Sequence, residues 1–239
     1  MKNFKYAFTL AETLLALAII GVIVVMTILV VMQDTSGKET LIKVQKSYSV
    51  LSNAFENALT KYGQVVDWDE ISTGSFERKM NDTMLAARNC GTANNLTAKN
   101  DCVPGCPSLY TIEGSLLNTC TSSNVSKMMT ADGFSYAFQI EDIGCATDVT
   151  GNTDRAPSAL KQVCGTIMVD IYATKKGREK NIYGSDLFLF YITREGILPV
   201  GLADDKKFPF DKTLCKKKVT QNLPGCTSQY IYDKHKIEE

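Results

Sequence analysis

Apolar residues dominate one long stretch near the start of the chain. Residues 8–32, FTLAETLLALAIIGVIVVMTILVVM, are apolar or small, with Glu12 as the one ionisable exception. At about 1.5 Å per residue, a helix of this length reaches roughly 37 Å, more than the roughly 30 Å of hydrocarbon in a bilayer. The pattern therefore predicts a helix whose first half, residues 8–32, spans a membrane.

A second pattern follows a polar interruption, QDTSG, at residues 33–37. Beyond it, apolar side chains recur at alternating spacings of three and four residues: Leu41, Val44, Tyr48, Leu51, Phe55, Ala58 and Tyr62. This spacing places them on one face of a helix, so residues 33–62 are expected to form its amphipathic half, with Gly63 at its end. A short coiled coil over residues 38–62 is the alternative for the same spacing.

The remaining chain, residues 63–239, predicts one exported globular head. Phe76, Met80 and Met84 are spaced for a short helix, and residues 90–120 have the Asn, Thr, Gly and Pro content of loops. Four segments favour strands: 134–140 and 167–171 by alternation, 187–192 as a strand covered on both faces, and 197–202 as its hairpin partner across Arg194-Glu195-Gly196. Gln229–Tyr232 is expected to add a last edge strand. One long helix followed by strands is an α+β layout with a mainly antiparallel sheet.

The seven residues before the apolar stretch, MKNFKYA, carry only positive charges, on Lys2 and Lys5. Positive charge on a short N-terminal side holds that end in the cytoplasm. The expected location is therefore the inner membrane, crossed once, with the C-terminal domain outside. A cleaved secretory signal is the alternative, because Ala16-Leu17-Ala18 has the small-x-small form, but fourteen mostly apolar residues follow it.

Glu12 lies five residues into the apolar stretch. A carboxylate in the middle of a membrane helix costs about 2.5 to 3.5 kcal/mol on the insertion scale, and less near an interface. A plain anchor has no use for such a residue. The sequence therefore predicts that Glu12 has a partner and a function.

These N-terminal residues resemble a known family. A short basic leader, a small residue, then Phe-Thr-Leu-x-Glu and about twenty apolar residues are similar to the N-terminus of type IV pilins and type II secretion pseudopilins. The resemblance implies that a prepilin peptidase removes residues 1–7 by cutting between Ala7 and Phe8, and that the new amino group of Phe8 is methylated. It also implies that Glu12 neutralises the Phe8 amino group of a neighbouring subunit. Ala7 stands where the family mostly has Gly.

The resemblance further implies a pilin-like fold and a structural role. The expected function is that of a pilin or pseudopilin, major or minor, in a type IV pilus or a type II secretion-like filament, extracellular or periplasmic after assembly. The implied partners are the prepilin peptidase, other pilin or pseudopilin subunits and an inner-membrane assembly platform. The alternative from the residues is a membrane-tethered extracytoplasmic domain that binds a surface, a glycan or DNA.

Charge and histidine content exclude several functions. The chain has 26 acidic and 26 basic residues, so no basic excess argues for nucleic-acid binding, and nucleic acid is not an expected partner. The single histidine, His235, lies in a charged C-terminal tail, and no Gly-rich phosphate loop occurs. The chain is therefore not expected to be an enzyme.

Eight cysteines lie beyond the predicted helix: Cys90, Cys102, Cys106, Cys120, Cys145, Cys164, Cys215 and Cys226. An even number outside the cytoplasm favours a disulfide framework, with pairing inside the 90–120 loop region but no connectivity fixed by sequence. A four-cysteine zinc site and thiol redox catalysis are the alternatives, and both lack the Cys-x-x-Cys spacing that they normally use.

One loop is a weak candidate for calcium. Residues 164–192 resemble a block of pilin-like head domains, and some pseudopilins bind calcium in a comparable C-terminal loop. Asp170 and Asp186 flank this loop, but it also carries Lys175, Lys176, Arg178 and Lys180. A hard cation needs six to eight oxygen ligands, so a solvated surface loop is favoured and no cofactor is expected.

Overall fold

The computed structural model describes residues 10–68, 73–84, 86–93, 108–110, 116–119, 125–151, 156–173, 182–212, 215 and 224–232, with side chains for all of these except residues 25–37, 73, 88–93, 108–110 and 116–119. The chain divides into two compact units, Met1–Glu39 and Thr40–Ile237. Each unit is described by itself below.

One helix, α1 (Leu10–Tyr62), runs through both units. The polar residues 33–37 therefore do not end the helix. It stops where the sequence predicts: Gly63 has a φ of +81° and its N–H donates to the Leu59 carbonyl at 2.9 Å. This left-handed glycine satisfies a carbonyl at the end of the helix, as a C-terminal cap does.

The prediction of a membrane-spanning half is wrong. Nowhere in the described part of the chain does a helix combine the length and the apolar character needed to cross a membrane. This finding corrects both the pilin-like fold class with its membrane-spanning helix and the single-pass inner-membrane location.

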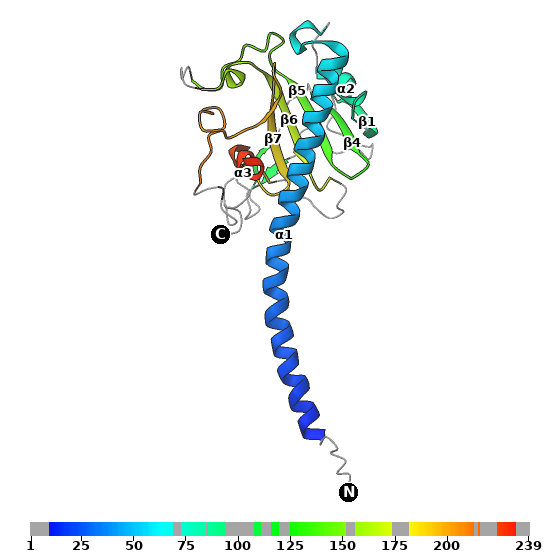
Figure 1. The fold of residues 1–239 in the computed structure, drawn as a ribbon, viewed down its shortest axis with the longest axis vertical. Helices are drawn as coiled ribbons and strands as arrows, with labels where there is room; N and C mark the ends of the chain where they lie inside the picture. Colours follow the sequence, from blue (N-terminus) through cyan, green and yellow to red (C-terminus); the bar gives the residue numbers. More distant parts are fainter. Residues whose placement is uncertain are drawn as a thin grey trace, which may run out of the picture. The chain divides into compact units, whose positions relative to one another are not determined.

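The second unit is built on a six-stranded antiparallel sheet, as the sequence predicts for the head (Figure 1). Its strand order is β1 (Ala86–Ala93), β4 (Val125–Thr130), β5 (Ser135–Ile140), β6 (Val163–Asp170), β7 (Leu187–Thr193) and β8 (Ile197–Pro199). A separate two-stranded sheet pairs β2 (Ser108–Tyr110) with β3 (Leu116–Thr119). Strands β1 and β4 were not expected from the sequence, and neither were β2 and β3, which lie within the expected loop region 90–120.

Strand β7 is buried along its whole length, as its apolar run predicts. Its pairing with β8 opposes Ile192 and Ile197 across the predicted turn. Phe188, Phe190 and Ile192 lie in the larger core, while Leu189 and Tyr191 lie in a second cluster. Because successive side chains of a strand point to opposite faces, β7 carries apolar cores on both faces of the sheet.

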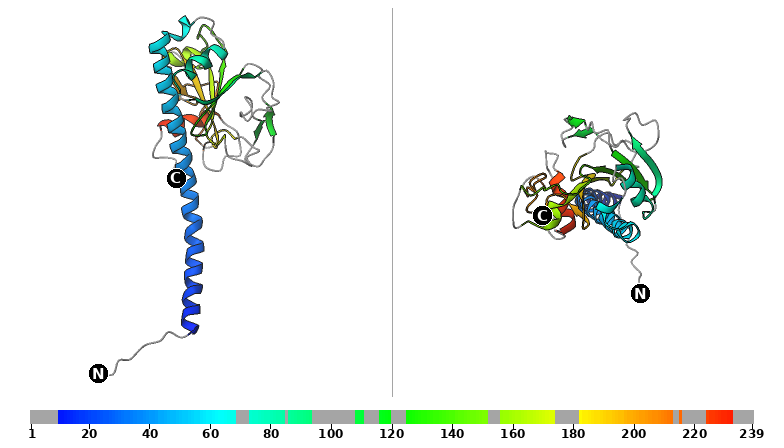
Figure 2. Two further views of the ribbon diagram at one scale, coloured as in Figure 1. Left: turned by 90° about the vertical axis from the view of Figure 1, so that its right-hand side faces the viewer. Right: turned by 90° about the horizontal axis from the view of Figure 1, so that it is seen from above.

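The larger core holds one face of α1, within Thr40–Tyr62, against the sheet (Figure 2). Four members of the predicted stripe are fully or almost fully buried: Val44, Leu51, Phe55 and Ala58. Helix α2 (Thr73–Asn81) contributes Phe76, whose ring lies 6.4 Å from that of Phe55 and 5.8 Å from that of Phe138 on β5. The rings therefore connect both helices to the sheet.

The expected last edge strand, Gln229–Tyr232, is instead part of helix α3 (Thr227–Tyr232). Short 3-10 helices precede it along the chain: η1 (Val65–Asp67), η2 (Ser158–Lys161) and η3 (Pro224–Cys226). The side chain of Gln45 on α1 donates to the Tyr230 carbonyl at 3.2 Å, and the Tyr230 ring packs edge-on against Phe188 at 5.0 Å. Four residues are too few to distinguish a helix from a strand by their pattern, and these tertiary contacts favour the helix.

The backbones at Gly201 and Gly225 lie close together, and this close approach generates a stability prediction. Gly201 has a φ of +87°, and a Cβ built on it would lie 1.8 Å from the Gly225 carbonyl oxygen. We expect Gly201→Ala to lower the free energy of unfolding by about 2 kcal/mol or more, because backbone must move to relieve the clash. Chemical denaturation measures the change.

Gly196→Ala is the matched control, since a Cβ there would meet nothing within 4 Å and Gly196 is not among the positive-φ glycines. We expect it to change stability by less than about 1 kcal/mol. Equal losses of stability for the two variants would contradict the predicted clash between a side chain at residue 201 and the Gly225 carbonyl.

Candidate functional site

The apolar segment Leu10–Val24 of α1 is the most exposed apolar surface of the described chain. Its large side chains have exposed fractions from 44% at Val24 to 81% at Leu10. The intervening members of this set are Leu14, Leu15, Leu17, Ile19, Ile20, Val22 and Ile23. Contiguous apolar surface of this extent usually marks a site of interaction with another molecule.

Glu12 lies in the first turn of this segment. A carboxylate near a helix N-terminus interacts favourably with the partial positive charge of the unpaired N–H groups there. The neighbouring Thr13 hydroxyl donates to the Leu10 carbonyl at 2.8 Å. The predicted processing residues, Ala7 and Phe8, lie outside the described residues, so their proximity to Glu12 stays a prediction.

The two calcium candidates lie at the ends of the loop between β6 and β7. Asp170 accepts a hydrogen bond from the Tyr172 N–H at 2.8 Å, and Asp186 accepts one from the Ile182 N–H at 2.6 Å. Asp186 is almost fully buried. Each carboxylate thus caps its own turn. Among the residues described, no group of three or more His, Cys, Asp or Glu side chains is suited to binding a metal ion. Most of the basic loop, residues 174–181, lies outside the described chain.

Four of the eight cysteines form two disulfides, Cys145–Cys164 and Cys215–Cys226. The predicted use of these cysteines in a disulfide framework is confirmed for both pairs. In the disulfide form these four residues present no thiolate as a ligand for zinc. The side chains of the other four predicted cysteines lie outside the described part: Cys90, Cys102, Cys106 and Cys120.

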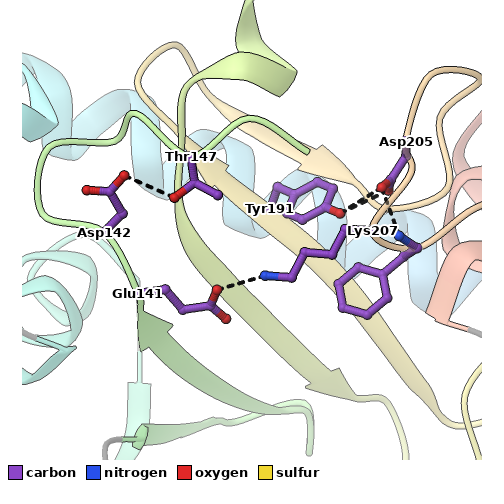
Figure 3. Close-up of polar contacts among 7 residues, drawn as sticks. Glu141, Asp142, Thr147, Tyr191, Asp205 and Lys207 are labelled. Atoms are coloured by element: carbon purple, nitrogen blue, oxygen red, sulfur yellow. Dashed lines mark hydrogen bonds and ion pairs between the residues drawn. The ribbon is translucent and has the colours of Figure 1, made fainter. Parts of the chain in front are cut away.

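A buried carboxylate that the sequence did not single out organises the second face of the sheet (Figure 3). Asp205 accepts the Tyr191 hydroxyl at 2.9 Å and 3.0 Å, and the N–H groups of Gly201 and Phe208 at 2.9 Å each. Burial, together with the nearby negative charge of Asp205, raises the pKa of the Tyr191 hydroxyl. Tyr191 therefore stays protonated and ties the loop around Asp205 to β7.

A second acidic residue shapes the loop that follows β5. Asp142 accepts hydrogen bonds from the Gly144 N–H at 2.9 Å, the Ala146 N–H at 2.8 Å and the Thr147 hydroxyl at 3.0 Å. Partial burial pushes the pKa of the Asp142 carboxyl upward, but these donors outweigh it and the pKa lies below its usual value. The preceding residue, Glu141, pairs with Lys207 at 2.7 Å.

Figure 3 shows the Asp142 carboxylate facing Thr147 of its own loop, and the Asp205 carboxylate facing Tyr191 of β7. Hydrogen bonds of this kind hold the donating groups in fixed positions around each carboxylate. We therefore assign Asp142 and Asp205, together with their donors, a role in fixing the loops that cover the second face of the sheet. No spacing rule in the sequence distinguishes Asp205 from its neighbour Asp204, so only the structure finds it.

Comparison of the chain with known protein families, with curated proteins and with solved structures finds no match in any of the three.

The Asp142 loop generates a pH-dependent prediction. At pH 7 we expect Asp142→Ala to lower the free energy of unfolding by about 1 kcal/mol, the low end for several hydrogen bonds at a surface. The folded pKa is depressed below the ordinary value of 3.8, so this stabilisation is present above about pH 4 and is lost as pH falls through the folded pKa.

The difference between wild type and Asp142→Ala should therefore shrink between pH 5 and about pH 2, measured by chemical denaturation. Asp142→Asn is the control, because it keeps one acceptor oxygen without an ionisable group. A wild type to Asp142→Ala difference that stays constant down to pH 2 would contradict the assigned role.

Proposed function

We propose that the chain is a structural subunit of a pilin-type filament, either a pilus or a type II secretion-like assembly. Subunits assemble helix against helix through the apolar segment Leu10–Val24 of α1. The observation that carries this proposal is the exposure of that segment, whose large apolar side chains are all at least 44% exposed. The resemblance of residues 8–32 to the pilin N-terminus supports the same assignment.

The energetics favour assembly over solvation. Complete burial of a single Leu, Ile or Val side chain contributes about 1.5–3 kcal/mol. The segment offers nine such side chains, so burial of most of them contributes a free energy of the same order as the roughly 4–15 kcal/mol that association costs in lost freedom of motion. Packing against several copies along a filament buries more of this surface than a single contact does.

Glu12 gives such an assembly its register. A carboxylate inside an apolar helix interface is costly unless a cation pairs with it. In the proposal, a prepilin peptidase cuts between Ala7 and Phe8, and the methylated amino group of Phe8 from the neighbouring subunit pairs with Glu12. A misplaced neighbour leaves both charges unpaired, so the pair selects one axial position.

The second unit then forms the outer surface of the filament. Its core is closed by the packing of α1, α2 and α3 on the sheet, and two described disulfides brace its loops. A disulfide-braced domain suits an exposed position in an oxidising compartment. In this account the chain is a structural protein and not an enzyme.

The experiment replaces one residue of the proposed interface. We expect Leu17→Asp, at a side chain that is 66% exposed, to lower the yield of filaments at least a hundredfold, because a charge enters an apolar interface. Electron microscopy and sedimentation of material from the native host measure assembly. Circular dichroism of the purified chain checks that the second unit still folds.

Ile143→Asp is the matched control, because Ile143 is 63% exposed and lies on the second unit. We expect it to assemble as the wild type does. If Leu17→Asp assembles normally, or if Ile143→Asp fails to the same degree, Leu10–Val24 is not the assembly surface.

A further inference from the structure

The two described disulfides differ in their access to solvent. Cys145 and Cys164 are both 0% exposed and belong to the larger core. Cys226 is 4% exposed, but its partner Cys215 is only half-buried. Thiol–disulfide exchange requires an attacking thiolate to reach one of the two sulfurs, so the pair with the more exposed cysteine reacts first.

The Cys215–Cys226 disulfide stands directly before α3. The two residues that follow it hold the helix to the sheet. Thr227 accepts the Leu189 N–H of β7 at 3.1 Å. Ser228 donates its N–H to the Val200 carbonyl at 3.0 Å and its hydroxyl to the Gly201 carbonyl at 2.7 Å. These hydrogen bonds hold the start of α3 against β7 and against the backbone that follows β8.

Helix α3 has six residues, and a helix this short is not stable by itself in water. Its position depends on the disulfide at its start and on contacts along its length. Those contacts include the Tyr230 hydroxyl, which donates to the Gly184 carbonyl at 2.7 Å, and Ile231, which is 9% exposed. The covalent link keeps these weak contacts close enough to form together.

We propose that Cys215–Cys226 is a redox-sensitive latch on α3. Reduction of this disulfide frees α3 from β7 and β8, while Cys145–Cys164 and the six-stranded sheet stay intact. Release uncovers the Val200 and Gly201 carbonyls and the Leu189 N–H, the kind of unpaired backbone groups at a sheet edge that invite pairing with another chain. The latch does not depend on the filament proposal.

The chemistry needs a dithiol such as dithiothreitol. One thiolate of the reductant attacks Cys215 Sγ, the Cys215–Cys226 bond breaks, and Cys226 leaves as a thiolate that takes up a proton. The second thiol of the reductant then loses its proton and displaces Cys215, which leaves as a thiolate and is protonated in turn. Two electrons pass to the protein, and the reductant becomes a cyclic disulfide.

The test adds dithiothreitol to the oxidised full chain at pH 8 without denaturant. Samples are quenched with N-ethylmaleimide and mapped by peptide mass spectrometry, with hydrogen exchange followed in parallel. We expect Cys215 and Cys226 to be alkylated at least tenfold faster than Cys145 and Cys164. The amides of Leu189 and Ser228 should then exchange at least tenfold faster, and that of Ile167 in β6 at an unchanged rate.

Ser228→Ala removes the hydroxyl that bonds to Gly201, so it should speed reduction of Cys215–Cys226 several-fold. Ser158→Ala, which removes an exposed hydroxyl near Glu195, is the matched control and should leave the rate unchanged. Equal alkylation of both disulfides would overturn the proposal. So would Leu189 and Ser228 amides that stay protected after Cys215–Cys226 is reduced.

Discussion

The second unit depends on burial of one face of α1, within Thr40–Tyr62, against the central strands of the sheet. Tyr48 stacks on Phe190 of β7 with ring centroids 5.7 Å apart, and Phe55 meets Phe76 of α2 at 6.4 Å. Trp68, just past the helix, lies 5.5 Å from Phe76 and donates its indole N–H to the Gly63 carbonyl at 2.9 Å. Aromatic pairs of this kind add specific geometry to the free energy of burial.

The same helix behaves differently in its first part. Between Leu10 and Val24 its apolar side chains face solvent rather than a core of their own unit. Large contiguous apolar surfaces that are exposed usually mark sites of interaction. Contact with other molecules is the simplest way to cover it, and the filament proposal assigns that contact to further copies of the same segment.

Sequence patterns foresaw much of the core. The spacing of Val44, Leu51, Phe55 and Ala58 gave the correct face of α1, because a helical stripe is a local property. The sequence also predicted β7 correctly from its continuous apolar run, together with its turn into β8. It did not predict helix α3, since four residues with mixed polarity are too few to distinguish the periods of helix and strand.

The polar features were harder to foresee than the core. Asp205 gained its role from Tyr191, Gly201 and Phe208, which meet only after the chain folds back on the sheet. Strand β4 contains the buried polar residues Lys127 and Ser126, so its sequence does not show the apolar pattern expected of an inner strand. The membrane-spanning expectation rested on the apolar character and length of residues 8–32, and no helix in the described part of the chain has both to the degree that spanning requires.

Mass spectrometry of the N-terminal peptide, taken from the chain as its native host makes it, tests the filament account most directly. The account predicts a chain that begins at Phe8 and carries one added methyl group on its amino nitrogen. A chain that still begins at Met1 with an unmodified leader would contradict it, because Glu12 would then lack the neighbouring amino group that sets the register of assembly.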